Sequence, residues 1–221
     1  MASREIKRRL TRRRILRAAL IEFARRGLDG AAVKTISERA GVANGTVFWH
    51  FDSKNRLYLE TVESAADEFY RELLPVVDRP RVSFMQVIDI AIGFLRAHPE
   101  IDMLLSSLRG EHPRPVVSEA TRLVDARGIA IWRRWIAQSG TGGHRMLPPS
   151  ASDGNLARLI TTMVSGVLAT RFLEEEFDAR TVLADFGALI ESSPASHPDD
   201  VVPAAGGTEE SCAARGEGSM R

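Results

Sequence analysis

The side chains best suited to chemistry lie close together in one short segment. Gly45 and Thr46 open an expected helix. Their backbone N–H groups and the threonine hydroxyl can therefore bind a phosphate at the positive end of the helix dipole. Asn44 suits the edge of an adenine, and the aromatic rings of Phe48 and Trp49 suit a thymine methyl or the sugar-phosphate backbone. This combination of residue types predicts contact with a nucleic acid.

Three cationic or titratable side chains flank that segment. His50 lies at the expected helix end, which favours a structural or phosphate-binding role over base reading. Lys54 begins the next expected helix, and Lys34 lies in the first turn of an earlier one. A positive charge at a helix start opposes the helix dipole, so a nearby phosphate is the simplest reason for both lysines.

Helices must position these side chains. Apolar residues recur at helical spacing over 11–26, with Thr11 as the expected cap and Gly27 as the end. Two short helices are expected over 33–40 and 44–51, with a glycine in the turn between them. Three short helices in this order predict a helix-turn-helix arrangement.

The rest of the chain also follows a helical pattern. No stretch alternates with period two for long enough to indicate a strand, and clusters of Pro and Gly separate the apolar segments. The predicted fold class is therefore all-α, with about nine helices. The six expected after the helix-turn-helix lie near 54–74, 82–97, 100–109, 116–138, 153–176 and 179–191.

Charge divides the chain into a basic head and an acidic body. Residues 1–60 hold 14 Lys or Arg against 6 Asp or Glu, whereas residues 61–221 hold 16 against 23. Such a head predicts a polyanionic partner. Residues 1–10 are expected to form a basic arm, either a solvated terminus or a segment that lies along phosphates or enters a minor groove.

The domain organisation follows from these changes in composition. The arm at 1–10 precedes a helix-turn-helix domain at 11–56, a helical domain at 57–190, and a tail at 191–221. The tail contains no Leu, Ile, Phe, Tyr or Trp, so we expect it to be disordered, with Cys212 exposed in it.

Three motifs in the head occur in a recognisable order. They are Ile15-Leu16-Arg17-Ala18-Ala19, then Ala40-Gly41-Val42, then Gly45-Thr46 with Phe48, His50-Phe51 and Lys54. With them, residues 14–62 resemble the DNA-binding domain of the tetracycline-repressor (TetR) family of bacterial transcription regulators. The resemblance implies that Lys34 and Lys54 contact the DNA backbone. It also implies that Asn44, Gly45, Phe48, Trp49 and His50 form the reading surface.

Two departures from the family pattern concern helix caps. Ala31-Ala32 stands where the family usually has Thr-Thr, so a hydroxyl cap worth about 0.5–2 kcal/mol is missing. Ala43 stands where the family often has Ser. Asn44 is therefore expected either to cap the recognition helix or to read a base, and DNA affinity to depend more on the basic arm.

The body offers a dimer interface and a pocket. A single helix-turn-helix reads few bases, so such proteins bind two-fold symmetric sites as dimers. The apolar helices near 153–176 and 179–191 are the expected homodimer interface, as in the family that the head resembles. That resemblance also implies a pocket for a small effector, but apolar side chains at helical spacing equally suit a packed core. The candidate lining residues are Met85, Phe94, Met103, Leu104, Leu108, Trp132 and Trp135.

Other classes of function are disfavoured. The five histidines lack metal-ligand spacing, no Ser lies in a Gly-x-Ser-x-Gly context, and the Gly-rich segment 140–144 lacks the lysine of a phosphate-binding loop. We expect no catalysis, cofactor, metal or membrane span, and a cytoplasmic location. The predicted protein is a repressor released from a palindromic operator by a small hydrophobic effector. The alternative is a ligand-independent DNA-binding regulator with a packed core.

Overall fold

The computed structural model describes residues 2–110, 114–138, 152–171 and 176–191. These residues form nine helices and no strand, as the helical patterning predicts. The expected tail and Cys212 lie outside the described residues. The helices are α1 (Ala2–Gly30), α2 (Val33–Ala40), α3 (Asn44–Phe51), α4 (Lys54–Val77), α5 (Phe84–Ala97), α6 (Pro99–Ser107), α7 (Pro115–Gln138), α8 (Asp153–Thr170) and α9 (Ala179–Glu191).

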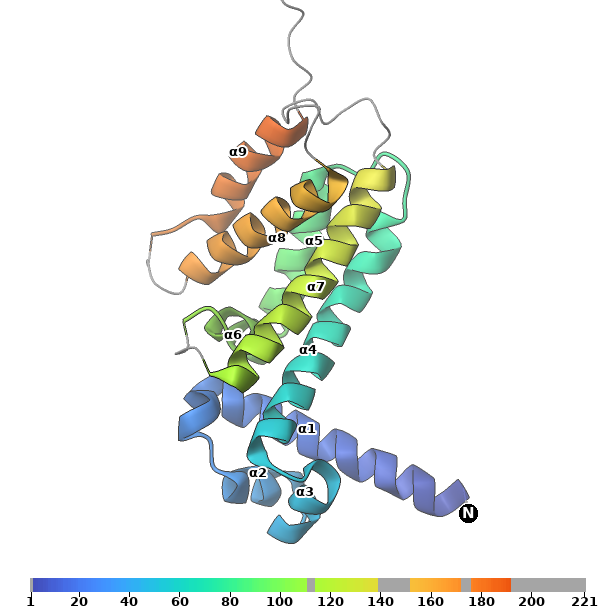
Figure 1. The fold of residues 1–221 in the computed structure, drawn as a ribbon, viewed down its shortest axis with the longest axis vertical. Coiled ribbons are helices and arrows are strands. Elements are labelled where there is room, and N and C mark those ends of the chain that lie inside the picture. Colours follow the sequence, from blue (N-terminus) through green and yellow to red (C-terminus); the bar gives the residue numbers. More distant parts are fainter. Residues whose placement is uncertain (1, 111–113, 139–151, 172–175, 192–221) are drawn as a thin grey trace, which may run out of the picture.

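The first three helices form a small head beneath a larger helical body (Figure 1). Helix α4 connects the two, because its first turns pack on α1 and α3 and its remainder runs beside α7 (Figure 1). Helices α8 and α9 lie together at the far end of the body, where α8 packs on α7 and α9 on α5. Helix α6 packs against α1, α4 and α8, so it bridges the head and the interior of the body.

Helix α1 is longer than expected. It begins at Ala2 instead of near Thr11, so the predicted arm at 1–10 is a helical extension within the described residues. Gly27 does interrupt the helix, with φ 64° and ψ −175°, a left-handed φ that glycine adopts without steric cost. One further turn continues to Gly30.

Serine side chains cap the N-termini of α4, α5 and α8. Ser53, Ser83 and Ser152 accept hydrogen bonds from the backbone N–H groups of Arg56, Gln86 and Asn155. Helix α2 has Ala32 at its N-cap and no side-chain cap, as expected from Ala31-Ala32. The Ala32 N–H instead donates to Oε1 of Glu22, a buried carboxylate of α1, at 3.4 Å.

The core is continuous from head to body. In the head, Ile15 and Phe23 of α1 are fully buried with Ile36, Val47 and Phe51. In the body, the rings of Phe84, Trp132 and Trp135 pack together, and Trp135 Nε1 donates to the Val82 carbonyl at 2.9 Å. None of the described helices is long and apolar enough to cross a membrane.

Candidate functional site

The turn between α2 and α3 is held by a glycine and an arginine. Gly41 has φ 63°, and its N–H donates to the Glu38 carbonyl at 3.1 Å, which ends α2. Arg14 of α1 donates to the Gly41 carbonyl at 3.1 Å and also to the Ala40 carbonyl. A side chain on Gly41 would therefore meet both an unfavourable φ and the Arg14 guanidinium, 2.7 Å from the added Cβ.

The N-terminus of α3 is open. Its N-cap is Ala43, which provides no side-chain cap, and Asn44 is the first helical residue. The expectation that Asn44 caps the helix is thus wrong, and its side chain is exposed beside the first turn. Gly45 is exposed as well, and a Cβ on it would meet nothing within 4 Å. Backbone N–H groups without an intrahelical partner at such an end can bind an anion.

The two faces of α3 differ sharply. Val47 and Phe51 are 1% exposed and pack in the head core, whereas Trp49 is 68% exposed and Phe48 is 41% exposed. Val47 and Phe51 are four residues apart and therefore lie on the same, inner face of the helix. A short helix with two large aromatic side chains in water presents a surface that a partner can cover.

His50 lies between these faces and beside α1. Its ring packs edge-on against Trp49, with the centroids 4.7 Å apart. Burial lowers the pKa of His50 below its ordinary value, and the positive charges of Arg8 and Arg12 lower it further. The end of α3 therefore already faces two arginines of α1.

The two predicted phosphate-binding lysines are placed differently. Lys34 is exposed in the first turn of α2, and no described residue forms an ion pair or hydrogen bond with its ammonium group. Lys54 is half-buried, and its Nζ donates to the Asp29 carbonyl near the end of α1 at 3.0 Å. Lys54 therefore also holds α1 to the start of α4, a role that its sequence position did not indicate.

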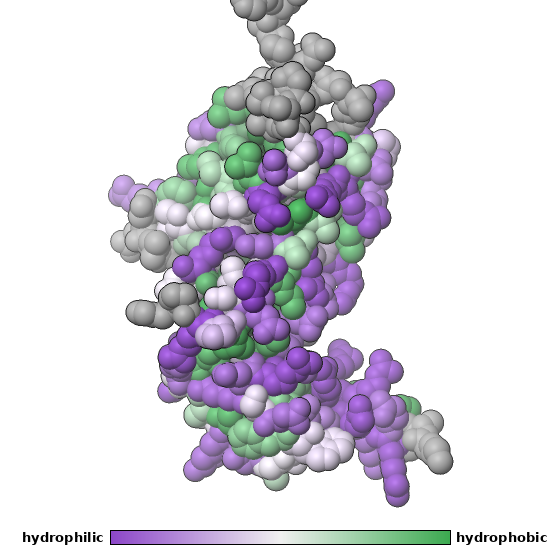
Figure 2. All heavy atoms as spheres, viewed as in Figure 1, coloured by the Kyte–Doolittle hydropathy of each residue, from purple (hydrophilic) through white to green (hydrophobic). Residues whose placement is uncertain are grey.

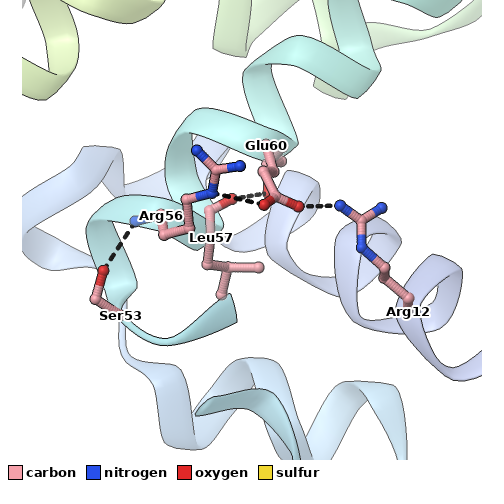
Figure 3. A network of polar contacts seen from close by, with 6 residues as sticks. Arg12, Ser53, Arg56, Leu57 and Glu60 are labelled. Atoms are coloured by element: carbon pink, nitrogen blue, oxygen red, sulfur yellow. Dashed lines mark hydrogen bonds and ion pairs between the residues drawn. The ribbon is translucent and has the colours of Figure 1, made fainter. Parts of the chain in front are cut away.

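A carboxylate on α4 anchors the basic helix α1. Glu60 receives an ion pair from Arg12 of α1 and another from Arg56 at 2.7 Å (Figure 3). The Arg12 guanidinium also lies 5.2 Å from the centroid of the Phe51 ring. These contacts fix the direction in which α1 leaves the head.

Beyond this anchor the extension of α1 projects into solvent. Residues 4–10 are all exposed, and in Figure 2 the projecting helix is mostly hydrophilic. Arg4, Lys7 and Arg9 have no ion-pair partner among the described residues, and Arg8 has only Glu5, at 3.8 Å. The extension therefore presents a concentration of unneutralised positive charge next to α3.

The body contains a cavity between α4, α6, α7 and α8. It is small, with a volume of about 60 Å³, and its mouth is open to solvent. Phe69, Tyr70 and Leu108 are among its apolar lining residues, and its charged lining residues are Asp102, Arg109 and Asp125. A larger and more open hollow of about 400 Å³, the outer hollow, lies beside it, and Ser106 and Arg109 line both.

The structure brings few of the predicted ligand-binding residues to this cavity. Leu108 lines it, and Met103 lines the outer hollow. Trp132, Trp135 and Leu104 are buried in the core instead. Phe94 packs against Phe69 and His98, and Met85 packs against the core.

Sequence reasoning missed the polar residues of the cavity. Tyr70, Asp102, Arg109 and Asp125 occupy helical positions that, along the sequence, look like any solvated face. Only the packing of four helices shows that they converge. The described residues contain no cluster of His, Cys, Asp and Glu that could hold a metal ion.

The comparisons with known proteins first concern the head. Residues 15–61 match the sequence model of the tetR family of bacterial regulatory proteins. The HTH-type transcriptional regulator SrpR of Pseudomonas putida is 46% identical over 44 residues, which is 20% of this chain and 21% of that protein. The chain thus aligns with about a fifth of the length of this curated relative.

Solved structures extend the similarity to the body. A Rhodococcus sp. structure described as a TetR-family transcriptional regulator has a TM-score of 0.67 and 23% identity, over 83% of this chain and 99% of the other. The complex of SmeT with triclosan has a TM-score of 0.66 and 22% identity, over 80% and 90%. SmeT is the repressor of a Stenotrophomonas maltophilia multidrug efflux pump. At such identities the similarity shows a shared fold.

Proposed function

Because the chain belongs to the TetR family of bacterial regulatory proteins, we propose that it is a sequence-specific DNA-binding regulator of transcription. We further propose that it is a repressor, released from a palindromic operator by a small effector. The observation that carries the first proposal is the outer face of α3. Its exposed Trp49 and Phe48 stand on a helix whose other side is fully buried in the head.

The exposed backbone and side-chain groups around α3 suggest how DNA binds to the head. The open N-terminus of α3 approaches a phosphate, with Gly45 allowing close contact. Asn44, Phe48 and Trp49 then face base edges and sugars in the major groove. Lys34 binds the backbone beside them. These contacts leave the buried face of α3 unchanged.

The extension of α1 supplies a second backbone contact. Its arginines are close enough to α3 for Arg8 to lower the pKa of His50. DNA held by α3 therefore lies within the field of the extension. A rigid helix of this width fits along phosphates and not inside the narrow minor groove, so backbone contact is the mode we propose.

A homodimer would place two heads on one palindrome. Helices α8 and α9 carry three large apolar side chains that are exposed in the single chain. They are Leu159 (57%), Met163 (41%) and Leu189 (53%). Figure 2 shows apolar surface over this end of the body. Apolar patches of this kind are typical of protein–protein contacts.

Helix α6 would couple the cavity to the heads. Asp102 and Ser106 of α6 line the cavity, while Glu100 on the same helix pairs with Arg17 of α1 at 2.7 Å. A ligand that moves α6 therefore acts directly on α1, which packs on α2 and holds the turn before α3 through Arg14. A coupling free energy of about 1–3 kcal/mol would change operator affinity about 5–150-fold. The SmeT–triclosan complex supports an effector in a protein of this fold.

The alternative is a regulator without an effector, whose body is only a packed core. The close packing of Phe84, Trp132 and Trp135 favours it, since the largest aromatic group of the body is buried away from the cavity. Thermal shift with a panel of hydrophobic compounds distinguishes the two. Stabilisation that is lost when the cavity is filled, for example in Ser165→Phe, indicates an effector site.

The test of DNA binding is footprinting on the intergenic DNA upstream of the protein's own gene across a salt series. We expect a protected palindrome and a steep salt dependence. Lys34→Ala should weaken binding and reduce the salt slope by about 1. The control is Arg122→Ala, which removes one exposed positive charge from α7. Equal binding by both variants and the unmodified protein would reject the proposed docking.

A further inference from the structure

The cavity is short of positive charge. Two carboxylates, Asp102 and Asp125, line it, against one guanidinium, that of Arg109. Arg109 is paired with Asp125 at 2.7 Å. Arg171 pairs with Asp102, although Arg171 itself does not line the cavity.

The surrounding charges do not correct this imbalance. The nearby Arg127 is held by two carboxylates of α4, Asp67 at 2.7 Å and Glu63 at 3.2 Å. Burial raises the pKa of Asp102 above its ordinary value despite the opposing charge of Arg171. The ionised form of Asp102 therefore gains from any further cation that enters the cavity.

Tyr70 contributes a polar group that lacks a partner. Its hydroxyl lies over Gly128 of α7, 3.0 Å from where a Cβ on that glycine would stand. Among the residues that the structure describes, none forms a hydrogen bond with it, and burial raises its pKa, so it is a neutral hydroxyl. A buried polar atom without a partner costs free energy, and a ligand N–H can satisfy it.

The apolar wall of the cavity is aromatic. The rings of Phe69 and Tyr70 both line it, with their centroids 4.9 Å apart. Aromatic faces carry partial negative charge and attract cations, most strongly away from water. The charged and the apolar parts of the lining thus favour the same kind of ligand.

We propose that this cavity binds a small lipophilic amine in its protonated form. Its ammonium group binds Asp125 and the hydroxyl of Tyr70, and its apolar part lies against Phe69 and Tyr70. This proposal rests on the proposed function, because it names the chemical class of the effector. An anion is disfavoured, since it could bind only Arg109 and would leave Asp102 and Asp125 facing a like charge.

The Arg109 guanidinium can break its ion pair with Asp125 and move into solvent. Its side chain borders both the cavity and the outer hollow, which is open to solvent. When the ammonium group of the ligand takes its place at Asp125, the guanidinium moves toward the outer hollow and into water. The exchange therefore conserves the charge around Asp125 and leaves no ion unpaired in the interior.

The test uses three small probes of nearly equal shape that suit a cavity of about 60 Å³, 2-methylpropylammonium, 2-methylpropanol and 2-methylpropanoate. Calorimetry with the purified full chain at pH 7 should show the cation binding at least tenfold more tightly than either of the others. Asp125→Asn should weaken binding of the cation at least tenfold. The matched control is Asp89→Asn, which removes a surface carboxylate of α5 that pairs with Arg180 at 2.8 Å.

A second variant guards against a folding defect in Asp125→Asn. Tyr70→Phe removes the unpartnered hydroxyl, so its thermal stability should equal or exceed that of the unmodified protein, while the affinity for the cation falls several-fold. An equal affinity for the alcohol or the carboxylate, no binding of the cation, or a cation affinity unchanged in both variants would overturn the proposal.

DNA binding in the presence of each probe separates this proposal from the proposed function. Tight binding of the cation without release of DNA would support the amine site and reject the effector role. Release of DNA by the alcohol as readily as by the cation would support the effector role and reject the amine class.

Discussion

Gly45 lies where α3 is expected to come closest to DNA, and nothing in the protein requires a glycine there. A Cβ at this position would meet no atom within 4 Å, and its φ is not positive. We predict that Gly45→Ala leaves thermal stability unchanged or raises it by about 0.5–1 kcal/mol, as for alanine in other helices. Operator affinity should fall at least tenfold, because the added methyl group would meet the sugar-phosphate backbone.

Gly93 provides the control for that prediction, since a Cβ there also meets nothing within 4 Å and it lies in α5 of the body. Gly93→Ala should raise stability in the same way and leave DNA affinity unchanged. Operator affinity unaltered by Gly45→Ala would mean that α3 does not approach DNA through its first turn. Melting curves and gel-shift titrations measure the two quantities.

His50 should make DNA binding depend on pH. In the free protein its pKa lies below 6.5, because burial and the charges of Arg8 and Arg12 disfavour the imidazolium. A bound phosphate nearby favours the imidazolium, so the complex takes up a proton and affinity should rise as the pH falls from about 7 to 5.5. Folding stability should change in the opposite sense, since the unfolded state takes up this proton at a higher pH than the folded state.

Fluorescence anisotropy at several pH values would measure this effect. In His50→Gln, which keeps a polar side chain but cannot gain a proton, the rise in affinity at low pH should be lost. An equal pH dependence in this variant would assign the effect to other groups.

Periodicity predicted the residues that pack and missed those that interact through polar groups. Val47 and Phe51 are four residues apart, so a helical pattern places them on one face, and both are buried. The hydrogen bond from Lys54 to the Asp29 carbonyl joins residues distant in the sequence, and no local pattern encodes it. The same holds for Asp102 and Asp125, which only the assembly of α6 and α7 brings to one cavity.

Helix ends were predictable where a strong local signal exists. The bounds of α2 and α3 agree with the expectation, because Gly41 with its left-handed φ stops α2 and a short turn separates it from α3. The start of α1 was placed too late, near Thr11. Residues 2–10 contain no apolar face for the core, so periodicity gave no sign of a helix there. Continuation of an existing helix adds a hydrogen bond per residue without a new nucleation cost, which favours the longer helix.

The extension of α1 is expected to act in binding and not in folding. Residues 4–10 are exposed, whereas Arg12 and Arg14 anchor α1 through Glu60 and the Ala40 carbonyl. Deletion of residues 2–9 should therefore change the melting temperature little, lower operator affinity, and reduce the salt slope by about 1 for each phosphate that the shortened protein no longer neutralises. Arg12→Ala should instead destabilise the head, because it removes a partner of Glu60. A salt slope unchanged by the deletion would mean that the extension does not touch DNA.

At the scale of the whole molecule, the head and the interior of the body share one short helix. Helix α6 is nine residues long. Its Glu100 forms an ion pair with Arg17 of α1, and its Asp102 lines the cavity. A second connection, between Arg114 at the start of α7 and Asp29 of α1, joins the same two regions. Any change of the cavity that moves α6 or α7 therefore also displaces α1.

Operator binding should depend on contacts at the opposite end of the molecule, through dimerisation. Leu159 and Leu189 are more than half exposed in the single chain. Replacing them with charged residues should therefore lower the folding stability of one subunit little. In a dimer joined through α8 and α9, the double variant Leu159→Glu, Leu189→Glu would bury two carboxylates per subunit against an apolar surface, which opposes association strongly. We predict a monomer of unchanged helicity in sedimentation experiments. Its affinity for a palindromic operator should fall to that for a single half-site.

The control for the dimer prediction is Leu74→Glu, an exposed leucine of α4 with 37% exposure. Because α4 lies outside the proposed interface, this variant should sediment and bind DNA like the unmodified protein. A dimer that persists in the double variant would place the interface on another surface. Two heads would then have a different spacing, and the length of the protected DNA would report it, since half-sites lie about one helical turn or a multiple apart.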